Sequence, residues 1–414
     1  MTDTCLRRTT CRLCSSKALE KVLELQPTPP ANAFVPGDRL GIEQPVFPLD
    51  LFFCTSCGHV QLLDVVDPKL LFENYVYVSG TSPVFVRHFE DYATDILDRF
   101  QPPAGALVVD IGSNDGTLLS FFKKAGYQVL GIDPAQAIAG DATTRGIETW
   151  CDFFTPKLSA SLKQQRGPAH VITANNVFAH ADDLNGIVTG VRELLASGGV
   201  FVFEVSYLVD VFEKTLFDTI YHEHVAYHSV KPLQQFFAAN GMELISAERI
   251  DSHGGSLRGV AQLADGPQAM QPSVARLISM EKSLGLDQAA TLQAFGQKID
   301  LVKAELTEIL RRLKAEGKSI AGFGAPAKAT TLMYHFGIGP DVIDFIVDDS
   351  PLKQNLYTPG MHIPVLPTQA IYDRKPDAVV ILAWNFAKPI MENHARYLAG
   401  GGQFIVPLPD VRVY

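Results

Sequence analysis

The chain has 414 residues, of which 47% are hydrophobic and 19% charged, and its formal net charge is -10. This length predicts two or three domains with sizeable cores, and the excess of acidic residues argues against a nucleic-acid or anionic-membrane surface. No run of about 18 apolar residues is present, so no transmembrane helix is expected, and the N-terminus lacks the apolar core of a signal peptide. We therefore expect a cytoplasmic monomer that binds small molecules, with neither nucleic acid nor a membrane as its partner.

Four of the six cysteines form two Cys-x-x-Cys pairs, Cys11/Cys14 and Cys54/Cys57. Each pair supplies two thiolates on a tight bend, as a tetrahedral zinc ion requires. A redox pair or unrelated thiols are the alternatives, but redox pairs are not usually doubled. Residues 1–75 are therefore predicted to form a small module whose order depends largely on a structural zinc ion.

A helix and then a strand are expected after this module. Residues 83–100 place apolar side chains on one stripe and precede Pro102 and Pro103, which predicts a helix that ends there. Residues 106–111 form a short apolar run rich in Val and Ile, which indicates one buried parallel strand. An acid, a glycine-punctuated turn and an amphipathic segment follow. Such a strand–turn–helix unit is typical of a nucleotide-binding α/β domain.

The turn after this strand reads Asp-x-Gly-x-Asn-x-Gly, because Asn114 and Thr117 stand where a dinucleotide fingerprint requires glycine. It resembles motif I of the class I S-adenosylmethionine (SAM) methyltransferases. A pyrophosphate binds to bare amides at a helix N-terminus, whereas SAM carries an amino-acid end and a sulfonium, which suit an acid and polar side chains. The alternative is a doubly wound domain with an unrelated glycine turn.

Two more strand ends contribute candidate ligands for SAM. The strand at 127–132 ends at Asp133, which is placed to bind the ribose hydroxyls, and the strand at 171–174 is followed by two asparagines. Open parallel sheets bind their ligands at such carboxyl ends. The predicted SAM-binding residues are Asp110, Gly112, Asn114, Gly116, Asp133, Asn175 and Asn176.

The rest of the chain predicts two α/β domains in succession. Strands at 198–205, 242–250 and 256–263 would complete a methyltransferase-type domain of residues 76–268. A second series follows in residues 269–414 and resembles half a Rossmann sheet. It comprises helices at 272–284 and 287–315 and strands at 319–323, 342–347, 378–383 and 403–406. The expected fold class is α/β, with a small zinc-binding module, a class I SAM methyltransferase domain and a second Rossmann-like half domain.

A second glycine-containing turn begins at Gly324 and reads Gly-Ala-Pro-Ala-Lys. Amides at a helix N-terminus together with a lysine attract an anion. The residues predicted to hold the diphosphate end of a second substrate are Gly324, Ala325 and Lys328, with Lys353 and Arg258 adding positive charge. The alternative is a tight strand–helix turn with a solvated lysine.

The densest polar cluster spans residues 218–229 and contains His222, His224 and His228. A His-x-His pair can bind a metal ion, but no third ligand stands at an obvious spacing, and the HExxH pattern fails because residue 226 is alanine. Imidazole titrates near neutral pH and is tuned by an adjacent carboxylate or phenol. Acid–base chemistry is therefore favoured over a metal site or a structural turn.

Four features, in this order, resemble the sugar C-methyltransferases, above all those acting on C-3 of nucleotide-linked 4-keto-6-deoxy sugars. They are the paired cysteine knuckles, the turn Asp110–Gly116, the segment Thr219-Ile-Tyr-His-Glu-His224, and the segment 253–258 followed by Gly-Phe-Gly-Ala-Pro-Ala-Lys at 322–328. The resemblance covers nearly the whole chain. It implies methyl transfer from SAM to a carbon of a nucleotide sugar, most simply a thymidine diphosphate sugar, in branched-chain deoxysugar biosynthesis, with a structural zinc ion remote from the chemistry.

The same resemblance implies roles for individual side chains. His224 is the base at C-3, Glu223 and Tyr221 orient it or hydrogen-bond the sugar, and His180 and Tyr75 complete the pocket. Tyr77 is a near-equal candidate for the role of Tyr75, and each of these neighbours has a purely structural alternative. Two other functions stay open at this point: SAM-dependent O- or N-methylation of a small metabolite, and a non-catalytic sugar-nucleotide-binding protein.

Overall fold

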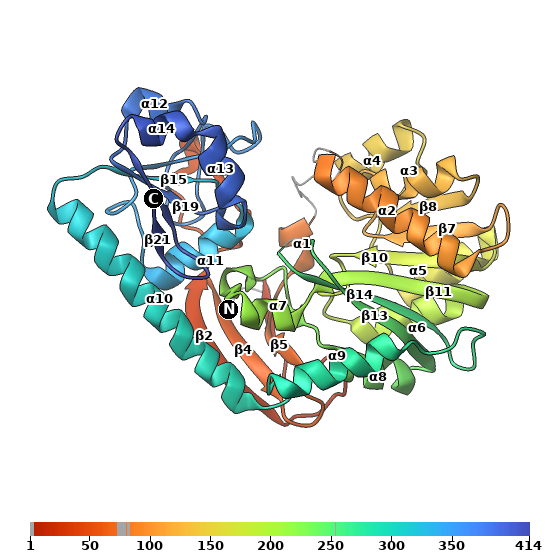
Figure 1. The fold of residues 1–414 in the computed structure, drawn as a ribbon. Helices are drawn as coiled ribbons and strands as arrows, with labels where there is room; N and C mark the ends of the chain where they lie inside the picture. The colour runs from red at the N-terminus through yellow and green to blue at the C-terminus, as the bar shows by residue number, and fades with distance from the viewer. Residues whose placement is uncertain (1–3, 73–79, 81–82, 253) are drawn as a thin grey trace.

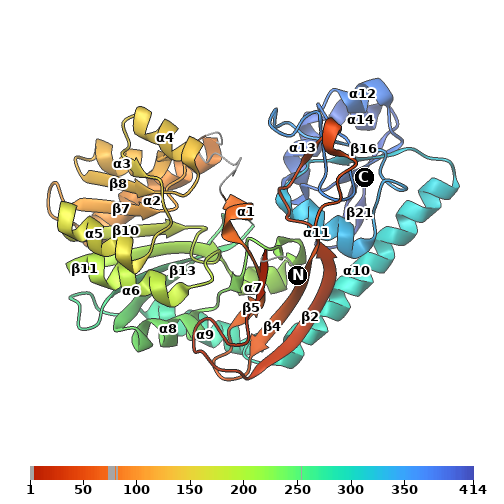
Figure 2. The same cartoon turned by 180° about the vertical axis from the view of Figure 1, so that it is seen from behind.

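The computed structural model describes residues 4–72, 80, 83–252 and 254–414. Figure 1 shows two α/β lobes, here called the central and C-terminal lobes, joined along one side by an N-terminal sheet and the long helix α10 (Ala289–Ala315). Figure 2 gives the view from behind, in which the same sheet and helix again bridge the lobes.

The central lobe is built on a seven-stranded sheet with the order β13-β14-β11-β10-β7-β8-β9. Its strands are β7 (Leu107–Ile111), β8 (Gln128–Ile132), β9 (Thr149–Trp150), β10 (Ala169–Asn175), β11 (Leu195–Ser206), β13 (Met242–Ile250) and β14 (Ser256–Leu263). β7 to β11 run parallel, whereas β14 is antiparallel to both of its neighbours. The carboxyl ends of β7, β8, β10 and β11 therefore meet at one edge.

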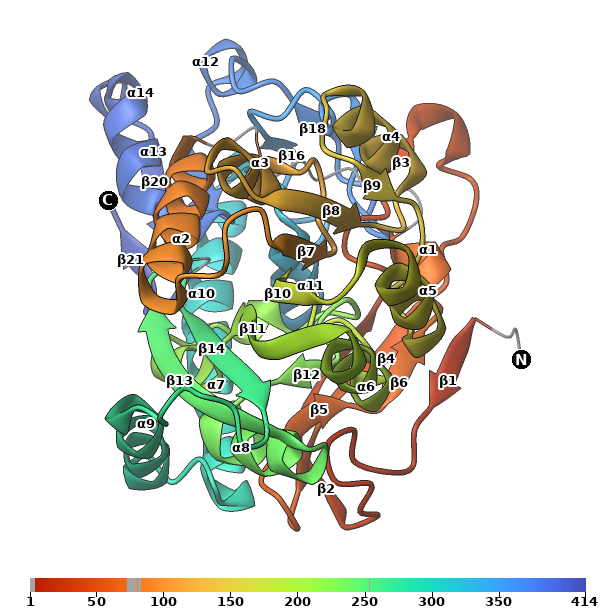
Figure 3. The ribbon, with the colours of Figure 1, turned by 90° about the vertical axis from the view of Figure 1, so that its right-hand side faces the viewer.

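Helices cover both faces of this sheet, which explains why its strands are apolar at successive positions. Val108 packs among side chains of α2 and α3, and Val109 packs on the opposite face with those of α5 and α6. Figure 3 shows the two helix pairs on opposite sides of the sheet. The helices are α2 (Pro83–Phe100), α3 (Thr117–Lys124), α4 (Gln136–Thr144), α5 (Pro156–Arg166), α6 (Leu184–Leu194), α7 (Leu208–Glu213), α8 (Val230–Ala239) and α9 (Pro272–Ser283).

The C-terminal lobe contains a six-stranded sheet with the order β18-β16-β15-β19-β20-β21, parallel except for β21. Its strands are β15 (Ile320–Phe323), β16 (Phe345–Val347), β18 (Val365–Leu366), β19 (Ala378–Ile381), β20 (Gln403–Val406) and β21 (Arg412–Val413). Its helices are α11 (Ala327–Phe336), α12 (Ala370–Arg374), α13 (Ala387–Asn393) and α14 (Ala395–Ala399). The order β18-β16-β15-β19-β20 repeats the order β9-β8-β7-β10-β11 of the central lobe.

The N-terminal sheet is antiparallel, has the order β12-β5-β4-β2, and takes one strand from the middle of the chain. Its strands are β2 (Leu19–Thr28), β4 (Phe47–Cys54), β5 (Val60–Leu62) and β12 (Ala226–Tyr227). The smaller N-terminal elements are β1 (Cys5–Arg7), which pairs with β6 (Asp64–Val66), β3 (Val35–Pro36), which pairs with β17 (Leu356–Tyr357), and α1 (Pro68–Phe72). Two strands from later in the chain, β12 and β17, thus pair with strands of the N-terminal region.

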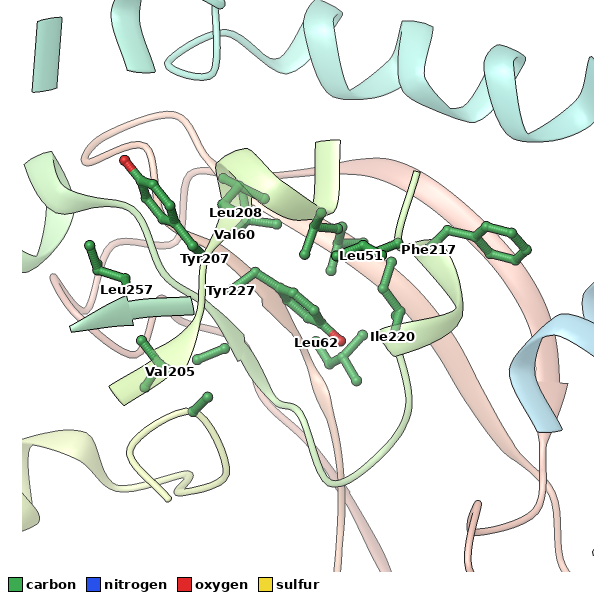
Figure 4. Close-up of a cluster of buried hydrophobic side chains, with 14 of the residues drawn as sticks. Leu51, Val60, Leu62, Val205, Tyr207, Leu208, Phe217, Ile220, Tyr227 and Leu257 are labelled. Carbon is green, nitrogen blue, oxygen red and sulfur yellow. The ribbon is translucent and has the colours of Figure 1, made fainter. Parts of the chain in front are cut away.

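A buried apolar cluster lies where these parts meet (Figure 4). Leu51 and Leu62 of the N-terminal sheet lie there beside Ile220 and Tyr227, which flank the histidine cluster, and Val205 of the central sheet. These side chains are at most 2% exposed. Burial of this kind contributes roughly 1.5–3 kcal/mol for each large side chain, so the polar segment between Ile220 and Tyr227 is anchored at both ends.

The structure confirms most of the predicted elements. The helix at 83–100 and the strands at 242–250 and 256–263 have the predicted bounds. The strand predicted at 342–347 begins only at Phe345, because residues 340–344 form a turn whose Asp344 carboxylate accepts the amide of Ile320. Among the described residues, no helix is long and apolar enough to cross a membrane.

Candidate active site

The turn after β7 is held in a conformation that favours glycine. Gly112 has a φ of 68°, and a Cβ at this position would overlap the side chain of Val177. Its amide donates to the carbonyl oxygen of Ile132 at 2.7 Å. Asp110, the last polar residue of β7, is 4% exposed and accepts a hydrogen bond from Thr173 Oγ1 at 2.6 Å. Burial raises the pKa of Asp110 to about 7.

Asp133 braces the same turn from the end of β8. Its Oδ2 accepts the amide of Asn114 at 2.9 Å, and its Oδ1 accepts the amide of Ala135 at 2.9 Å. Asn114 has a φ of 49° and Gly116, the N-cap of α3, has a φ of 76°. Burial raises the pKa of Asp133, and the two amides oppose that effect. Each carboxylate oxygen keeps a second lone pair, so a ribose hydroxyl can still donate to this group.

The two asparagines lie at the same sheet edge. Asn175 ends β10 opposite Glu204 of β11, and the amide of Asn176 donates to the carbonyl oxygen of Glu204 at 2.8 Å. The structure thus gathers all seven predicted SAM-binding residues around the carboxyl ends of β7, β8 and β10. The sequence analysis assigned no role to Glu204, although its place at a strand end was a signal for one.

Arg258 does not lie with the other residues predicted to bind the diphosphate. Its Nη2 lies 2.6 Å from Glu204 Oε1, and its guanidinium lies 4.2 Å from the ring centroid of Tyr92. It belongs to β14 of the central lobe, whereas Gly324 follows β15 of the C-terminal lobe (Figure 1). Burial would raise the pKa of Glu204, but His88 and Arg258 outweigh burial and lower it. The prediction that Arg258 adds charge at the diphosphate site is therefore corrected, because Arg258 is an ion-pair partner of the buried Glu204 carboxylate.

The structure brings together three of the predicted catalytic side chains, His180, Tyr221 and His224. The ring centroids of His180 and His224 are 4.9 Å apart, and those of Tyr221 and His224 are 4.2 Å apart. His224 Nδ1 lies 2.8 Å from the carbonyl oxygen of Thr219. A carbonyl only accepts, so Nδ1 carries the proton and the lone pair of the neutral ring is on Nε2. Tyr75 and Tyr77 lie outside the described residues.

Glu223 directly precedes His224 in the chain and is 3% exposed. Its Oε1 accepts a hydrogen bond from Asn32 Nδ2 at 3.2 Å, and burial raises its pKa to about 7. A carboxyl with such a pKa is protonated in part of the molecules at neutral pH. Asn32 was missed by the sequence analysis, because nothing in the loop after β2 pairs it with a residue 191 positions away.

The other two histidines of the cluster are core residues. His222 is buried with Nε2 3.3 Å from the carbonyl oxygen of Phe47, and His228 stacks between Phe178 and His59. Burial lowers the pKa of each histidine to about 4, so both are neutral at neutral pH. In the part of the chain that the structure describes, a potential metal-binding group of His, Cys, Asp or Glu occurs only at the four paired cysteines.

The turn after β15 gathers three of the residues predicted to bind the diphosphate. Gly324 has a φ of 84°, the amide of Ala325 donates to Asp348 Oδ2 at 2.6 Å, and Lys353 Nζ donates to the carbonyl oxygen of Ala325 at 2.8 Å. Lys328 is the second residue of α11, and its Nζ is 3.8 Å from Asp218 Oδ2. Asp348 was not among the predicted residues, although it ends the second strand of its sheet as Asp133 does.

The four paired cysteines have the geometry of a zinc site. Their sulfur atoms all lie within 4.8 Å of one another, with Cys11 and Cys57 separated by 3.7 Å and Cys14 and Cys54 by 3.6 Å. A tetrahedral ion with Zn–S bonds of about 2.3 Å separates its ligands by about 3.8 Å. The four thiols therefore fit zinc.

The zinc knuckle is connected to the loop after β10 through one carboxylate. Arg12, which lies between Cys11 and Cys14, places its Nε 3.1 Å from Asp182 Oδ1, and Arg8 Nη1 lies 3.0 Å from Asp182 Oδ2. Asp182 follows His180 by two residues, in the loop after β10. The N-terminal residues thus hold the loop that carries His180.

Comparison with known proteins extends these observations. Residues 11–72 match a family model of a zinc binding domain, residues 85–247 a methyltransferase domain, and residues 251–409 a C-methyltransferase C-terminal domain. The C-methyltransferase NovU of Streptomyces niveus is 34% identical over 403 residues, which cover 97% of this chain and 96% of NovU. A ubiquinone biosynthesis O-methyltransferase of Xanthomonas oryzae is 29% identical over 111 residues, 26% of this chain and 45% of that protein.

Among solved structures, magnesium protoporphyrin IX methyltransferase of Synechocystis PCC 6803 with bound SAM aligns with a TM-score of 0.33 at 14% identity, over 44% of this chain and 81% of that chain. The motifs, the sheet order and the matched domains define a SAM-dependent methyltransferase with a zinc-binding N-terminal domain. More particularly, the chain belongs to the C-methyltransferase family that includes NovU. Its cofactors are SAM and a structural zinc ion.

Replacing one zinc ligand should remove the metal and loosen the N-terminal residues. Cys54→Ser is expected to lower the zinc content below one equivalent and to lower Tm by roughly 10 °C. The reason is that losing the metal removes a few kcal/mol of folding free energy, and each kcal/mol shifts Tm by about 2–4 °C. Metal analysis and thermal unfolding measure both effects, with Cys5→Ser as the control outside the cluster. Full zinc content in Cys54→Ser would contradict the assignment of this ligand.

Adding a methyl group at Gly112 should weaken SAM binding. Gly112→Ala forces a residue with a Cβ into a φ of 68° and against Val177, so the turn must shift and the Kd for SAM should rise at least about tenfold, equivalent to about 1.4 kcal/mol. Gly140→Ala in α4 is the matched control, because nothing lies within 4 Å of the added Cβ there. Calorimetric titration with SAM compares the two, and equal affinities would rule out the turn as the site.

The raised pKa of Glu223 predicts a specific pH dependence of stability. The carboxyl titrates near pH 4.5 when unfolded and near pH 7 when folded, so its contribution to folding is present below pH 4.5 and is lost as the pH rises to 7. Glu223→Gln removes the ionisable group and therefore this loss. The free energy of unfolding of the variant, relative to that of the native chain, should be about 3 kcal/mol higher at pH 8 than at pH 4. Denaturant unfolding at the two pH values measures it, with the exposed Glu43→Gln as control. A gain that does not vary with pH would contradict the shift.

Proposed function

We propose that the chain transfers the methyl group of SAM to C-3 of a nucleotide-linked 4-keto-6-deoxy sugar, a thymidine diphosphate sugar, with His224 as the base. The observation that supports this proposal is the set of contacts around His224, in a chain that belongs to the C-methyltransferase family. Its Nδ1 is fixed by the Thr219 carbonyl, its ring contacts those of His180 and Tyr221, and the buried Glu223 is its neighbour in the chain.

The chemistry requires a base because a sugar C–H is inert unless it adjoins a carbonyl. In the proposed reaction His224 Nε2 takes the proton from C-3, and the electron pair of the C–H bond delocalises onto the C-4 oxygen as an enolate. Bound SAM supplies the electrophilic methyl group and departs as S-adenosylhomocysteine with the electrons of the S–C bond. The new C–C bond uses the enolate pair, so charge and atoms balance.

The side chains near His224 are suited to stabilising the enolate and orienting the imidazole. With a pKa raised to about 7, Glu223 can be protonated and donate a hydrogen bond to the developing oxygen charge, as can the hydroxyl of Tyr221. His180 stacks on the imidazole and restricts its orientation.

The diphosphate of the sugar nucleotide is proposed to bind at the turn after β15. Gly324 permits close approach of the backbone, the N-terminus of α11 follows it, and Lys353 places an ammonium beside Ala325. Burial lowers the pKa of Lys353, and Asp348 opposes this. The central lobe would then supply SAM and the C-terminal lobe the second substrate.

His224→Asn should lower kcat by about 10²–10⁴, the contribution of general-base catalysis, while SAM still binds. Labelled hydrogen at C-3 of the keto sugar should wash out in the native enzyme and not in this variant. His170→Asn, at the amino end of β10, is the matched control and should keep full activity. Methylation that retains the C-3 label would favour transfer to oxygen or nitrogen, and no S-adenosylhomocysteine from any keto sugar nucleotide would favour a binding protein.

A further inference from the structure

Helix α11 of the C-terminal lobe contacts the segment that carries the proposed base. This segment, residues 218–224, is called the catalytic segment below. Thr331 Oγ1 donates to the carbonyl oxygen of Ile220 at 2.7 Å, and Lys328 Nζ lies 3.8 Å from Asp218 Oδ2. Just before the segment, Phe217 stacks on Phe336 at the end of the same helix, with ring centroids 5.1 Å apart.

We propose that Lys328 and Thr331 are positioning residues for His224, and that Lys328 serves Asp218 rather than a substrate diphosphate. The proposal rests on the proposed function, in which His224 is the base. It departs from the sequence-based prediction that Lys328 binds an anion at the turn after β15.

The argument begins with Thr219, which lies between the two residues that α11 holds. The carbonyl oxygen of Thr219 accepts the proton of His224 Nδ1, and this bond decides that the basic lone pair is on Nε2. Because Asp218 and Ile220 are both fixed to α11, the direction of the carbonyl between them is fixed as well. The helix therefore sets both the tautomer and the orientation of the base.

The surroundings of Lys328 explain why its positive charge is paired with Asp218. Asp218 is fully buried, and its Oδ2 accepts a hydrogen bond from Trp384 Nε1 at 2.6 Å. The ammonium of Lys328 lies 4.0 Å from the centroid of the Trp384 ring, and its side chain is 13% exposed. A buried carboxylate that loses its cation is left with an uncompensated charge. Lys328 thus neutralises Asp218 and contacts Trp384, while Lys353 supplies the charge at the turn after β15.

The first experiment separates a positioning role from diphosphate binding. Lys328→Met should lower kcat about tenfold or more and change KM for the sugar nucleotide by less than about threefold. The double variant Asp218→Asn/Lys328→Met removes both charges, and should recover most of the lost kcat. A rise in KM at unchanged kcat, with no recovery in the double variant, would overturn the proposal and return Lys328 to the diphosphate.

The second experiment tests the hydroxyl of Thr331. Thr331→Val has the same shape but no donor, and should lower kcat about tenfold with unchanged SAM affinity, whereas Thr331→Ser keeps the donor and should retain native kcat. Thr307→Val in α10 is the matched control, because that hydroxyl bonds only within its own helix. Native kcat in Thr331→Val would contradict the proposed role.

A spectroscopic measurement makes the inference independent of turnover. In protein labelled with 15N-histidine, His224 should show the Nδ1-protonated tautomer, its signal being identified by its loss in His224→Asn. Thr331→Val should shift this signal toward the other tautomer or toward exchange, and Thr331→Ser should not. If no keto sugar nucleotide is methylated, the proposed function fails while this measurement still decides the positioning. An unshifted tautomer in Thr331→Val overturns the positioning even if methylation is confirmed.

Discussion

The hydrogen bond from His224 Nδ1 to the Thr219 carbonyl fixes the imidazole and is the contact on which the proposed chemistry depends. An imidazole can act as a base only at the nitrogen that lacks the proton, and a backbone carbonyl is an acceptor that does not titrate. Three parts of the chain hold this short segment. α11 contacts Ile220, Asn32 contacts Glu223, and β12 follows directly as a strand of the N-terminal sheet. His224, the proposed base, therefore lies where these three parts of the chain meet.

The fold was largely predictable because its signals are local. The strand at 106–111 is apolar on both faces, and the helix at 83–100 carries one apolar stripe. Each pattern is therefore sufficient to predict its own element. The cysteine pairs were predictable for the same reason, since each knuckle is a short motif. The two-residue strand β12 was not predictable, because its pairing with β5 depends on residues far away in the chain.

The sequence nominated residues for the site but not their contacts. Spacing and family resemblance nominated His224, Glu223 and the turn after β7, but gave no reason to pair Asn32 with Glu223 or Asp218 with Lys328. Arg258 shows the same limit: a cation close to a motif in sequence was assigned to an anion, whereas the fold gives it to Glu204. Partners of buried charges are decided by tertiary packing, which a linear pattern does not encode.

The two lobes build their turns in the same way. The amide of Asn114 donates to Asp133, and the amide of Ala325 donates to Asp348, in each case from the turn after the first strand to an acid after the second. The helices that follow differ in what they contact: α3 packs on α2 within its own lobe, whereas α11 reaches the catalytic segment. An enolate must form only when an electrophilic methyl group is present, or its proton simply returns. In the proposed reaction, a base held by contacts from both lobes meets this requirement better than one held by either lobe alone, since the methyl donor and the ketone are proposed to bind to different parts of the chain.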